Sequence, residues 1–344
     1  MKIAIVHYWL IGMRGGEKVL ENFCKLYPSA DIYTHVYNSN KVSDIINSHK
    51  IYTTFINKLP FSKKIYKLYL PLMPLALRLL DLKDYDLIIS SESGPAKGFI
   101  KNKKSFHLCY CHTPMRYLYD MRNQYLNGFN LLNRFFINFF LERLKVWDIN
   151  TSQNINIIIA NSSFVAKRIK KNWLKDSTVI NPSINFDDFY ITDNKKKYYL
   201  IISELVKYKR IDIAINAFNK LNDTLYIIGN GSLLKKYKGL SNKNIIFLEN
   251  IDDVKKSKYL SNCKALIFPG IEDFGIVPLE AMASGRPVIA YKSGGIVDTL
   301  QEGLNGLFFN QQMPDSLVNS IKYFEKNIED FDSYKIRDSI KSFS

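Results

Sequence analysis

Short apolar runs alternate with amphipathic segments along most of the chain. Helical patterns begin near Glu17, after Ser163 and at Ile211. Apolar runs of the length typical of strands cover residues 3–7, 31–36, 86–90, 106–111, 154–162, 198–203, 225–229, 245–248, 265–268 and 288–291. This alternation predicts an α/β fold whose parallel sheets carry helices on both faces.

The alternation breaks at residues 179–197, VINPSINFDDFYITDNKKK, where Pro182 and a charged run replace the apolar pattern. A chain of 344 residues is also too long for a typical single domain. We therefore expect two domains followed by a helical tail. The predicted ranges are a first domain at 1–180, a linker at 181–197, a second domain at 198–318 and the tail at 319–344.

Composition narrows the class of protein. The four cysteines, Cys24, Cys109, Cys111 and Cys263, lack the spacing of a metal or redox site, so we expect buried thiols in a reducing compartment. The first ten residues, MKIAIVHYWL, have the pattern of a strand and not that of a signal peptide. Because no uninterrupted apolar run reaches about 18 residues, a membrane-spanning helix is not expected.

Positive charge is concentrated in the first half. Residues 1–180 contain 26 Lys+Arg and 12 Asp+Glu, a net charge of +14, whereas residues 181–344 contain 22 and 20, a net charge of +2. Such asymmetry predicts an anionic partner. No nucleic-acid-binding motif is present, which favours a membrane surface or a diphosphate lipid over nucleic acid.

Two segments of the first half, 55–79 and 129–147, combine aromatic and charged residues in amphipathic helical patterns. This mixture suits helices that lie in a lipid interface. The alternative is an ordinary core-facing helix with a solvated basic face.

Two glutamates eight positions apart, Glu272 and Glu280, lie in LIFPGIEDFGIVPLEAMASGRPVIAYKSGGIVD (266–298). Pro278 suits the first position of a helix, which would place Glu280 in the first turn, where free N–H groups and the helix dipole favour an anion. Gly285 is expected to end this helix. Strand, loop, short helix and strand in this order are typical of a nucleotide-binding βαβ unit.

This stretch resembles the E-x7-E motif of the family 4 retaining glycosyltransferases, which have the GT-B fold, and FGxxxLEAMASGxPVIA (274–290) extends the resemblance. The resemblance runs over nearly the whole chain and points to bacterial mannosyltransferases of O-antigen and exopolysaccharide assembly. It implies two facing Rossmann-like domains with an interdomain cleft. An acceptor would bind in the first domain and a nucleotide-sugar in the second.

The family also implies roles for the residues of this motif. Its first glutamate contacts the donor sugar and its second the nucleotide ribose, which assigns these roles to Glu272 and Glu280. The loop and helix start between them would complete the donor site. The residues expected there are Asp273, Phe274, Gly275, Ile276 and Val277.

Glycine pairs after two strands fit the same family. Gly15-Gly16 matches its GGxE motif, in which the backbone can approach a diphosphate at a helix start. Gly229 and Gly231 resemble the GxG turn near the nucleotide base and phosphates.

Two further motifs follow strands of the first domain. His112 opens HTPMRY and matches the family's donor-sugar-contacting histidine, and Arg116 of this motif is assigned to the acceptor. Ser91, in SSESGPAKG (90–98), is also assigned to the acceptor. Glu92 and Lys97 of that segment fit a solvated ion pair equally well.

SELVKYKRID (203–212) departs from the family pattern S/G-R-L-x-x-x-K. Lys209 matches the lysine that contacts the donor diphosphate, and Arg210 adds a cation, but Glu204 occupies the arginine position. A desolvated, unpaired carboxylate there would repel a diphosphate. Glu204 could pair with Lys207 or Arg210, become protonated, or mark a weak or inactive enzyme. The two extra cations favour the first outcome.

These features predict a retaining glycosyltransferase that moves a hexose, with mannose as first choice, from a nucleotide-sugar to a lipid-linked or polysaccharide acceptor in bacterial surface glycan assembly. His112, Glu272 and Lys209 are its expected catalytic residues. We expect a cytoplasmic protein bound peripherally to the inner face of the plasma membrane. The alternatives are a catalytically silent donor- or lipid-binding subunit, which Glu204 keeps open, and a GT-B nucleotide-sugar epimerase.

No metal or other cofactor is expected, and the nucleotide-sugar is a substrate. Two D-x-D sequences occur, at 84–86 and 330–332. Both lie outside the loops expected to line the cleft, so we interpret them as chance.

Overall fold

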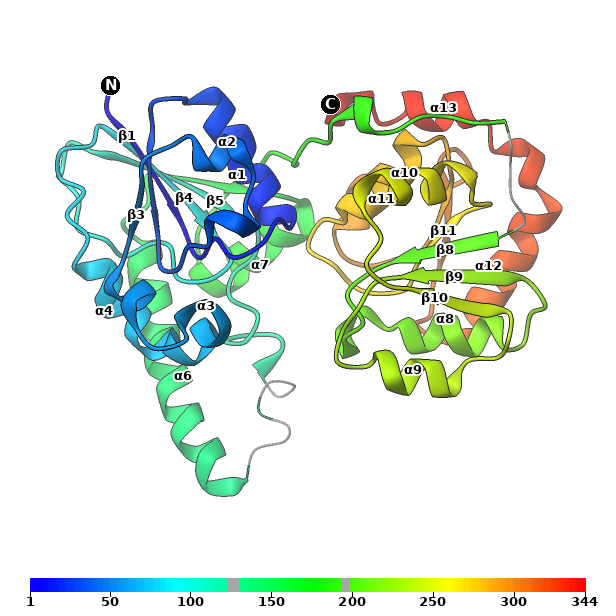
Figure 1. Cartoon of the computed structure of the whole chain (residues 1–344), viewed down its shortest axis with the longest axis horizontal. Helices are drawn as coiled ribbons and strands as arrows, with labels where there is room; N and C mark the ends of the chain where they lie inside the picture. Colours follow the sequence, from blue (N-terminus) through cyan, green and yellow to red (C-terminus); the bar gives the residue numbers. More distant parts are fainter. Residues whose placement is uncertain (123–125, 127–129, 194–197) are drawn as a thin grey trace. The chain divides into compact units, whose positions relative to one another are not determined.

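The computed structural model describes residues 1–122, 126, 130–193 and 198–344 (Figure 1). It divides into two compact units, Met1–Asn181 and Pro182–Ser344. Each unit is built on one sheet in which all pairs of neighbouring strands are parallel. Within the described residues, no helix is both long enough and apolar enough to cross a bilayer.

The first unit contains a seven-stranded sheet in the order β3-β2-β1-β4-β5-β6-β7. Its strands are β1 (Ile3–His7), β2 (Asp31–Thr34), β3 (Ile51–Thr53), β4 (Leu87–Glu92), β5 (Phe106–Cys111), β6 (Ile157–Ala160) and β7 (Thr178–Val179). Every residue of the central strand β1 is buried, as expected for a strand that is covered on both faces.

Alternate residues of β1 face the two layers of helices. Ile3 and Ile5 pack in one cluster with Leu20 of α1 (Gly15–Leu26), whereas Ala4 and Val6 pack in another with Leu77. The other helices of the unit are α2 (Asp44–Asn47), α3 (Ser62–Ile65), α4 (Met73–Arg78), α6 (Leu131–Ser152) and α7 (Ser163–Trp173).

The second unit contains a six-stranded sheet in the order β10-β9-β8-β11-β12-β13. Its strands are β8 (Tyr198–Ile202), β9 (Thr224–Ile228), β10 (Ile245–Leu248), β11 (Leu266–Phe268), β12 (Val288–Tyr291) and β13 (Gly306–Phe309). The helices are α8 (Ile211–Phe218), α9 (Leu234–Leu240), α10 (Asp253–Asn262), α11 (Ile276–Ala283), α12 (Pro314–Lys326) and α13 (Ser333–Asp338). Figure 1 shows α10, α11 and α13 on one side of this sheet and α8 and α9 on the other.

The predicted linker and tail both contribute to the second unit. Ile184 and Phe189, from the linker range, and Phe324 and Ile336, from the tail, are buried in its core. Residues 194–197 of the predicted linker lie outside the described part of the chain. The same holds for Phe129, the first residue of the segment 129–147, while Asn130 caps α6 and residues 131–147 lie in that helix.

The prediction of an amphipathic helix over 55–79 is wrong. The segment forms a 3-10 turn (Phe55–Lys58), α3, a second 3-10 stretch (Tyr66–Leu72) and α4. Pro60, Pro71 and Pro74 explain this breakage, because proline removes a backbone donor and clashes with the preceding turn. Strands β3, β7 and β13 were also not predicted. The first two have only three and two residues, too few to show a strand pattern.

Candidate active site

Loops at the carboxyl ends of four neighbouring strands, β9, β8, β11 and β12, interlock in the second unit. A Cβ atom at Gly229 would overlap the carbonyl oxygen of Ser203, and one at Gly231 would overlap the backbone of Leu205. Gly229 also has a φ of 148°, a conformation that favours glycine. These two predicted donor residues therefore have a packing role, because they let the loops after β9 and β8 touch.

The next pair of loops brings two predicted catalytic residues together. A Cβ at Gly270 would crowd the backbone of Lys209, so the loops after β8 and β11 are in direct contact. The Lys209 ammonium forms an ion pair with Oε1 of Glu272. The side chains are only 14% and 24% exposed, which protects the pair from full screening by solvent.

Gly294 and Gly295 hold the loop of Glu272 from the other side. The N–H of Gly295 donates to the carbonyl oxygen of Glu272 at 2.9 Å, and a Cβ on Gly295 would overlap the backbone of Asp273 and Phe274. The Phe274 side chain is 4% exposed and belongs to the core. Phe274 can therefore offer a ligand its backbone but not its ring.

Helix α11 begins earlier than predicted. Gly275, with a φ of 99°, precedes the helix, and Ile276 and Val277 are its first two residues. Pro278 is therefore the third helical residue, where its missing N–H would have had no helical partner in any case. The expected placement of Glu280 in the first turn is wrong, because Glu280 is the fifth residue of the helix.

The predicted helix stop is confirmed. Gly285 has a φ of 70°, its N–H donates to Met282 at 2.9 Å, and the N–H of Arg286 donates to Ala281 at 2.9 Å. These two hydrogen bonds are those of a Schellman C-terminal motif, which requires a left-handed residue after the helix.

Glu280 is held by a partner that the sequence did not indicate. Its side chain is 5% exposed, and Oε1 lies 3.1 Å from Nζ of Lys256 on α10. Burial lowers the pKa of Lys256, but the charges and hydrogen bonds of Glu280 and Asp253 together outweigh burial, so the pKa is raised overall. Any contact of Glu280 with a ribose would have to coexist with this pair or break it.

The loop after β8 carries Glu204 and Arg210. The Glu204 side chain is exposed. The Arg210 guanidinium lies 3.2 Å from Asp212 and donates to Oε1 of Gln312 at 3.0 Å. Gln312 in turn donates to the carbonyl oxygen of Pro269 at 3.0 Å. Arg210 thus helps to tie its loop to the loop of Glu272.

In the first unit, side chains from the ends of three adjacent strands form a hydrogen-bonded chain. Nδ1 of His7, at the end of β1, lies 2.9 Å from Oγ of Ser91 on β4. The same Oγ lies 2.8 Å from Nε2 of His112, which directly follows β5. The predicted residues Ser91 and His112 are thus brought together, and His7 joins them.

The backbone around His112 is fixed at several points. Its N–H donates to the carbonyl oxygen of Glu92 at 2.8 Å, and the guanidinium of Arg168 on α7 bonds the Thr113 hydroxyl. Burial, with a smaller contribution from His7, lowers the pKa of His112 to about 3. A neutral imidazole at His112 can act as both a donor and an acceptor. Arg116, the other predicted acceptor residue, contacts the sulfur of Met121 at 4.0 Å.

Gly15 and Gly16 are the first two residues of α1, so this helix starts two residues before the predicted Glu17. A Cβ at Gly16 would overlap the hydroxyl of Tyr8, which gives this glycine a packing role. Glu17 is 2% exposed and accepts a hydrogen bond from the N–H of Arg14 at 3.1 Å.

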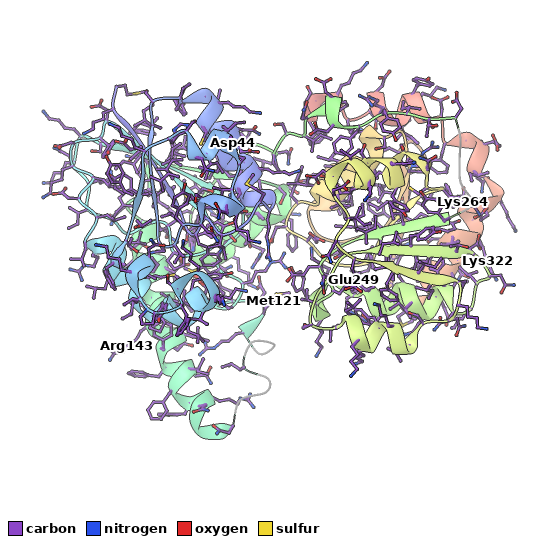
Figure 2. All side chains as sticks on the ribbon, viewed as in Figure 1. Asp44, Met121, Arg143, Glu249, Lys264 and Lys322 are labelled. Carbon is purple, nitrogen blue, oxygen red and sulfur yellow. The ribbon has the colours of Figure 1, made fainter. Side chains whose placement is uncertain are left out.

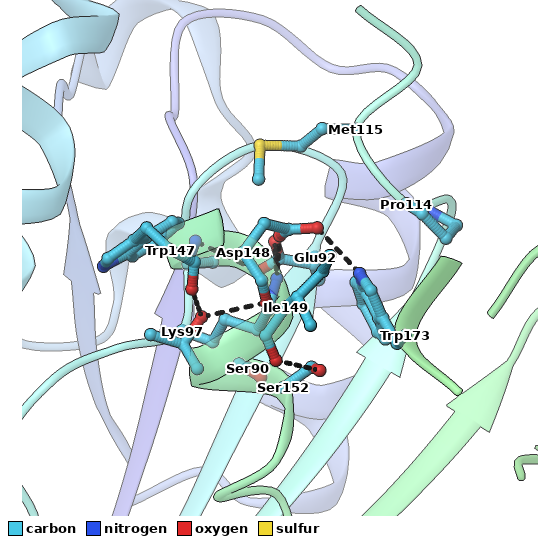
Figure 3. A network of polar contacts seen from close by, with 12 residues as sticks. Ser90, Glu92, Lys97, Pro114, Met115, Trp147, Asp148, Ile149, Ser152 and Trp173 are labelled. Atoms are coloured by element: carbon cyan, nitrogen blue, oxygen red, sulfur yellow. Dashed lines mark hydrogen bonds and ion pairs between the residues drawn. The ribbon is translucent and has the colours of Figure 1, made fainter. Parts of the chain in front are cut away.

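The interpretation of Glu92 and Lys97 as a solvated pair is wrong. Both side chains have no exposed surface, and the Lys97 ammonium pairs with Glu92 at 2.9 Å and also with Asp148 (Figure 3). Asp148 lies on α6, far away in sequence, and it also accepts a hydrogen bond from Nε1 of Trp173 at 2.7 Å.

Among the residues that the structure describes, no three His, Cys, Asp or Glu side chains are grouped as metal ligands. The D-x-D sequences include aspartates with structural partners. Asp86 accepts a hydrogen bond from the N–H of Lys2 at 2.7 Å, and Asp332 caps the start of α13.

Reasoning from the sequence missed His7 and Lys256. The position of His7 could have indicated a role in the site, because His7 ends the first strand. In a doubly wound parallel sheet the first strand lies inside the sheet, and its carboxyl end faces ligands. Lys256 had no such indication, because it is one of several lysines on a helix without a motif.

A family model matches most of the second unit. Residues 185–337 match the model of the family described as glycosyl transferases group 1. An uncharacterized glycosyltransferase of Methanocaldococcus jannaschii is 28% identical over 183 residues, which is 51% of this chain and 51% of that protein. The alpha-1,3/1,6-mannosyltransferase ALG2 of Dictyostelium discoideum is 28% identical over 289 residues, which is 67% of this chain and 65% of the relative. The chain thus spans about half to two thirds of these relatives.

Solved structures confirm the fold over the whole chain. HepE of Anabaena, in complex with UDP, has a TM-score of 0.70 at 16% identity and covers 100% of this chain and 96% of its own. Sucrose-phosphate synthase of Thermosynechococcus elongatus has a TM-score of 0.74 at 16% identity, with 100% and 95% covered. The predicted fold class is therefore confirmed. The chain has the GT-B fold, with parallel sheets in two α/β units, and residues 185–337 of its second unit match the model of the group 1 glycosyl transferases.

Proposed function

We propose that this chain is a family 4 retaining glycosyltransferase that moves a hexose from a nucleotide-sugar to a lipid-linked or polysaccharide acceptor in bacterial surface glycan assembly. The observation that carries the proposal is the ion pair between Lys209 and Glu272, set among four interlocked loops at the carboxyl edge of the second sheet. In open α/β sheets this edge is where ligands bind.

The ion pair suggests how a donor is received. A diphosphate competes with Glu272 for the Lys209 ammonium, and its arrival releases the carboxylate to accept hydrogen bonds from the sugar hydroxyls. The N–H groups of Ile276 and Val277, which begin α11, add donors for the leaving group. Stabilising the departing diphosphate lowers the barrier to an oxocarbenium-like sugar.

Mannose, carried by GDP, is our first choice of sugar. It is supported by relatives named alpha-1,3/1,6-mannosyltransferase ALG2, which are 24–28% identical to this chain. The test is a thermal-shift screen of GDP-mannose against UDP-glucose and UDP-N-acetylglucosamine, followed by mass analysis and anomeric analysis of the product. Stabilisation by GDP-mannose, with an α-linked product, supports the proposal, and selective stabilisation by a UDP-sugar contradicts the choice of donor.

The acceptor is proposed to be held at the cytoplasmic face of the plasma membrane, where the first unit binds as a peripheral protein. Two neighbouring surfaces support this. On α6, Phe135, Phe136 and Phe139 are 67%, 61% and 55% exposed, and Arg143 lies over the Phe139 ring (Figure 2 labels Arg143). Beside α6, the segment 61–79 exposes several apolar side chains together with three lysines, Lys63, Lys64 and Lys67.

Apolar contacts connect these two surfaces. Leu70, in the second segment, packs against the same buried cluster as Ile137 and Phe140 of α6. Exposed aromatic rings interleaved with cations are the composition that partitions into an anionic lipid interface.

A silent binding subunit remains the second candidate, and Glu204 is the residue that favours it. The discriminating experiment measures donor binding and donor hydrolysis by the purified protein and by Glu272→Ala. Binding without turnover in the wild type, with lipid acceptor present, would favour the silent subunit. A Glu204→Arg variant that lost activity would show that Glu204 has a role of its own.

A further inference from the structure

The side chains of Glu17, His7, Ser91 and His112 form one continuous row, in which the first three are buried and His112 is half-buried. Oε1 of Glu17 lies 3.9 Å from Nε2 of His7, Nδ1 of His7 lies 2.9 Å from Oγ of Ser91, and that oxygen lies 2.8 Å from Nε2 of His112. Glu17, His7 and Ser91 are 2%, 0% and 0% exposed.

The Ser91 hydroxyl couples the protons of the two rings. A hydroxyl carries one hydrogen, so Ser91 can donate to only one of the two ring nitrogens and must accept from the other. If Ser91 donates to Nδ1 of His7, then Nε2 of His112 must carry a hydrogen and donate to Ser91. If Ser91 donates to His112, then Nδ1 of His7 must carry the hydrogen.

The carboxylate of Glu17 selects between these arrangements. In a neutral His7 with its hydrogen on Nδ1, the lone pair of Nε2 would face a carboxylate in a buried, poorly screened environment. With the hydrogen on Nε2, the N–H dipole points toward the negative charge. The second form is favoured, and it requires Ser91 to donate to His7 and His112 to donate to Ser91.

We infer that Glu17 and His7 are positioning residues that hold His112 in the Nε2–H tautomer and so make its Nδ1 a hydrogen-bond acceptor. Within the described part of the chain, no residue bonds Nδ1 of His112. This acceptor suits a hydroxyl of a bound saccharide, and this last step rests on the proposed function. The tautomer assignment itself rests only on the geometry of the row.

The experiment is ¹H–¹⁵N correlation spectroscopy of the histidine rings in the free protein at mildly alkaline pH. Only five histidines are present, and two provide internal references. His35 places Nε2 3.0 Å from the carbonyl oxygen of Pro95, which requires Nε2–H, whereas His49 places Nδ1 2.8 Å from that of Ala30, which requires Nδ1–H. The signals of His112 are assigned by their loss in His112→Gln.

In the wild type, His112 is expected to match the His35 reference. Glu17→Gln is expected to change the His112 tautomer to the Nδ1–H form. The glutamine amide can donate to Nε2 of His7, which reverses the direction of each hydrogen bond in the row. Glu17→Asp, which keeps the charge, is the matched control and is expected to leave the tautomer unchanged. Unchanged signals of His35 and His49 show that each variant is folded.

Two results would overturn the inference. One is a wild-type His112 in the Nδ1–H form, which is also what an imidazolium at His7 would impose. The other is a His112 tautomer that does not respond to Glu17→Gln. Neither result depends on donor binding or turnover, so failure of this inference is distinct from failure of the proposed function.

Discussion

Lys97 and Glu92 form an ion pair that is wholly removed from solvent, with Nζ 2.9 Å from Oε1. Asp148 of α6 also pairs with Lys97, so two carboxylates share one ammonium in the interior of the first unit. The carbonyl oxygen of Glu92 accepts the N–H of His112 at 2.8 Å, and Ser91 is the residue before it. This buried network therefore holds the strand end that carries the predicted acceptor residue.

Replacing the cation should destabilise the first unit strongly. Lys97→Met leaves two buried carboxylates without their counter-charge, and removing one partner of a buried pair costs about 3–5 kcal/mol. All three tryptophans, Trp9, Trp147 and Trp173, lie in the first unit, so denaturant unfolding followed by tryptophan fluorescence reports on this unit alone.

The matched control is Lys170→Met, which breaks the exposed pair of Lys170 with Asp176. Its expected cost is below about 1 kcal/mol, because solvent screens such pairs. A second variant, Lys97→Met with Glu92→Gln, should recover part of the loss, since it removes one of the stranded charges. A Lys97→Met variant as stable as this control would contradict the account.

The same network predicts a pH dependence. Burial raises the pKa of the Glu92 carboxyl from 4.5 to about 7, with Lys97 opposing the shift and Asp148 adding to it. The folded state therefore binds more protons than the unfolded state between these values, so this contribution to stability is fully present below pH 4.5 and is lost as the pH rises through 7. Compared with Glu92→Gln, which does not titrate, the free energy of unfolding of the wild type should fall across this window. If the free energy of unfolding of the wild type, relative to that of Glu92→Gln, stayed constant or rose with pH across this window, the predicted pH dependence would be wrong.

Local sequence patterns predicted most of the second unit, because its motifs combine strands with the turns that end them. The glycines at 229, 231 and 285 could be recognised as turn residues, and each has either a left-handed φ or a close backbone neighbour. The start of α11 was misplaced because Pro278 outweighed Gly275 in the prediction. The left-handed φ of Gly275 depends on the loop packing, which no local pattern encodes.

Long-range pairing explains the other errors. Lys97 looked solvated because its second carboxylate, Asp148, is 51 residues away on α6. His7 was overlooked because its partners lie on other elements: Ser91 reaches it only when β1 and β4 lie side by side, and Glu17 only when α1 packs against the sheet. Edge strands of two or three residues likewise depend on the neighbouring strand for their existence.

The interlocked loops should tolerate no side chain at Gly295. Gly295→Ala places a Cβ inside the backbone of Asp273 and Phe274, and backbone cannot move aside as a side-chain end can. We expect a loss of about 1–3 kcal/mol, typical of overpacking, and weaker nucleotide binding because the Glu272 loop is displaced. Gly239→Ala, in α9 with open space around it, is the control and should gain about 0.4–1 kcal/mol. Unfolding followed by circular dichroism measures both, and equal stabilities would contradict the packing role.

Lys209 should be needed for turnover more than for folding. Lys209→Met removes the ammonium proposed to neutralise the departing diphosphate, and the loss of one such group lowers kcat by about 10²–10³. Lys207→Met is the matched control, because Lys207 lies in the same 3-10 turn (Lys207–Lys209) but is exposed. Transfer kinetics with a lipid-linked acceptor distinguish the two variants, and equal kcat values would remove Lys209 from the proposed mechanism.

Binding to anionic vesicles should depend on both exposed surfaces of the first unit. Neutralising Lys63, Lys64 and Lys67 to glutamine is expected to weaken binding about fivefold per lysine, since each cation near an anionic leaflet contributes about 1 kcal/mol. Co-sedimentation with vesicles that contain an anionic phospholipid measures this, and the lysine variant should approach the wild type at high salt, where screening removes the electrostatic term.

Substitutions in the aromatic surface of α6 distinguish insertion into the lipid from attraction between charges. Changing Phe135, Phe136 and Phe139 to serine should weaken binding at high salt as well, because burial of apolar rings in the interface is insensitive to screening. Tyr323→Ser and Tyr334→Ser, at exposed aromatic positions of the second unit, are the controls and should leave binding unchanged. If the phenylalanine variant bound as tightly as these controls, α6 would not be the inserting element, and the membrane contact would be limited to the lysines of the 61–79 segment.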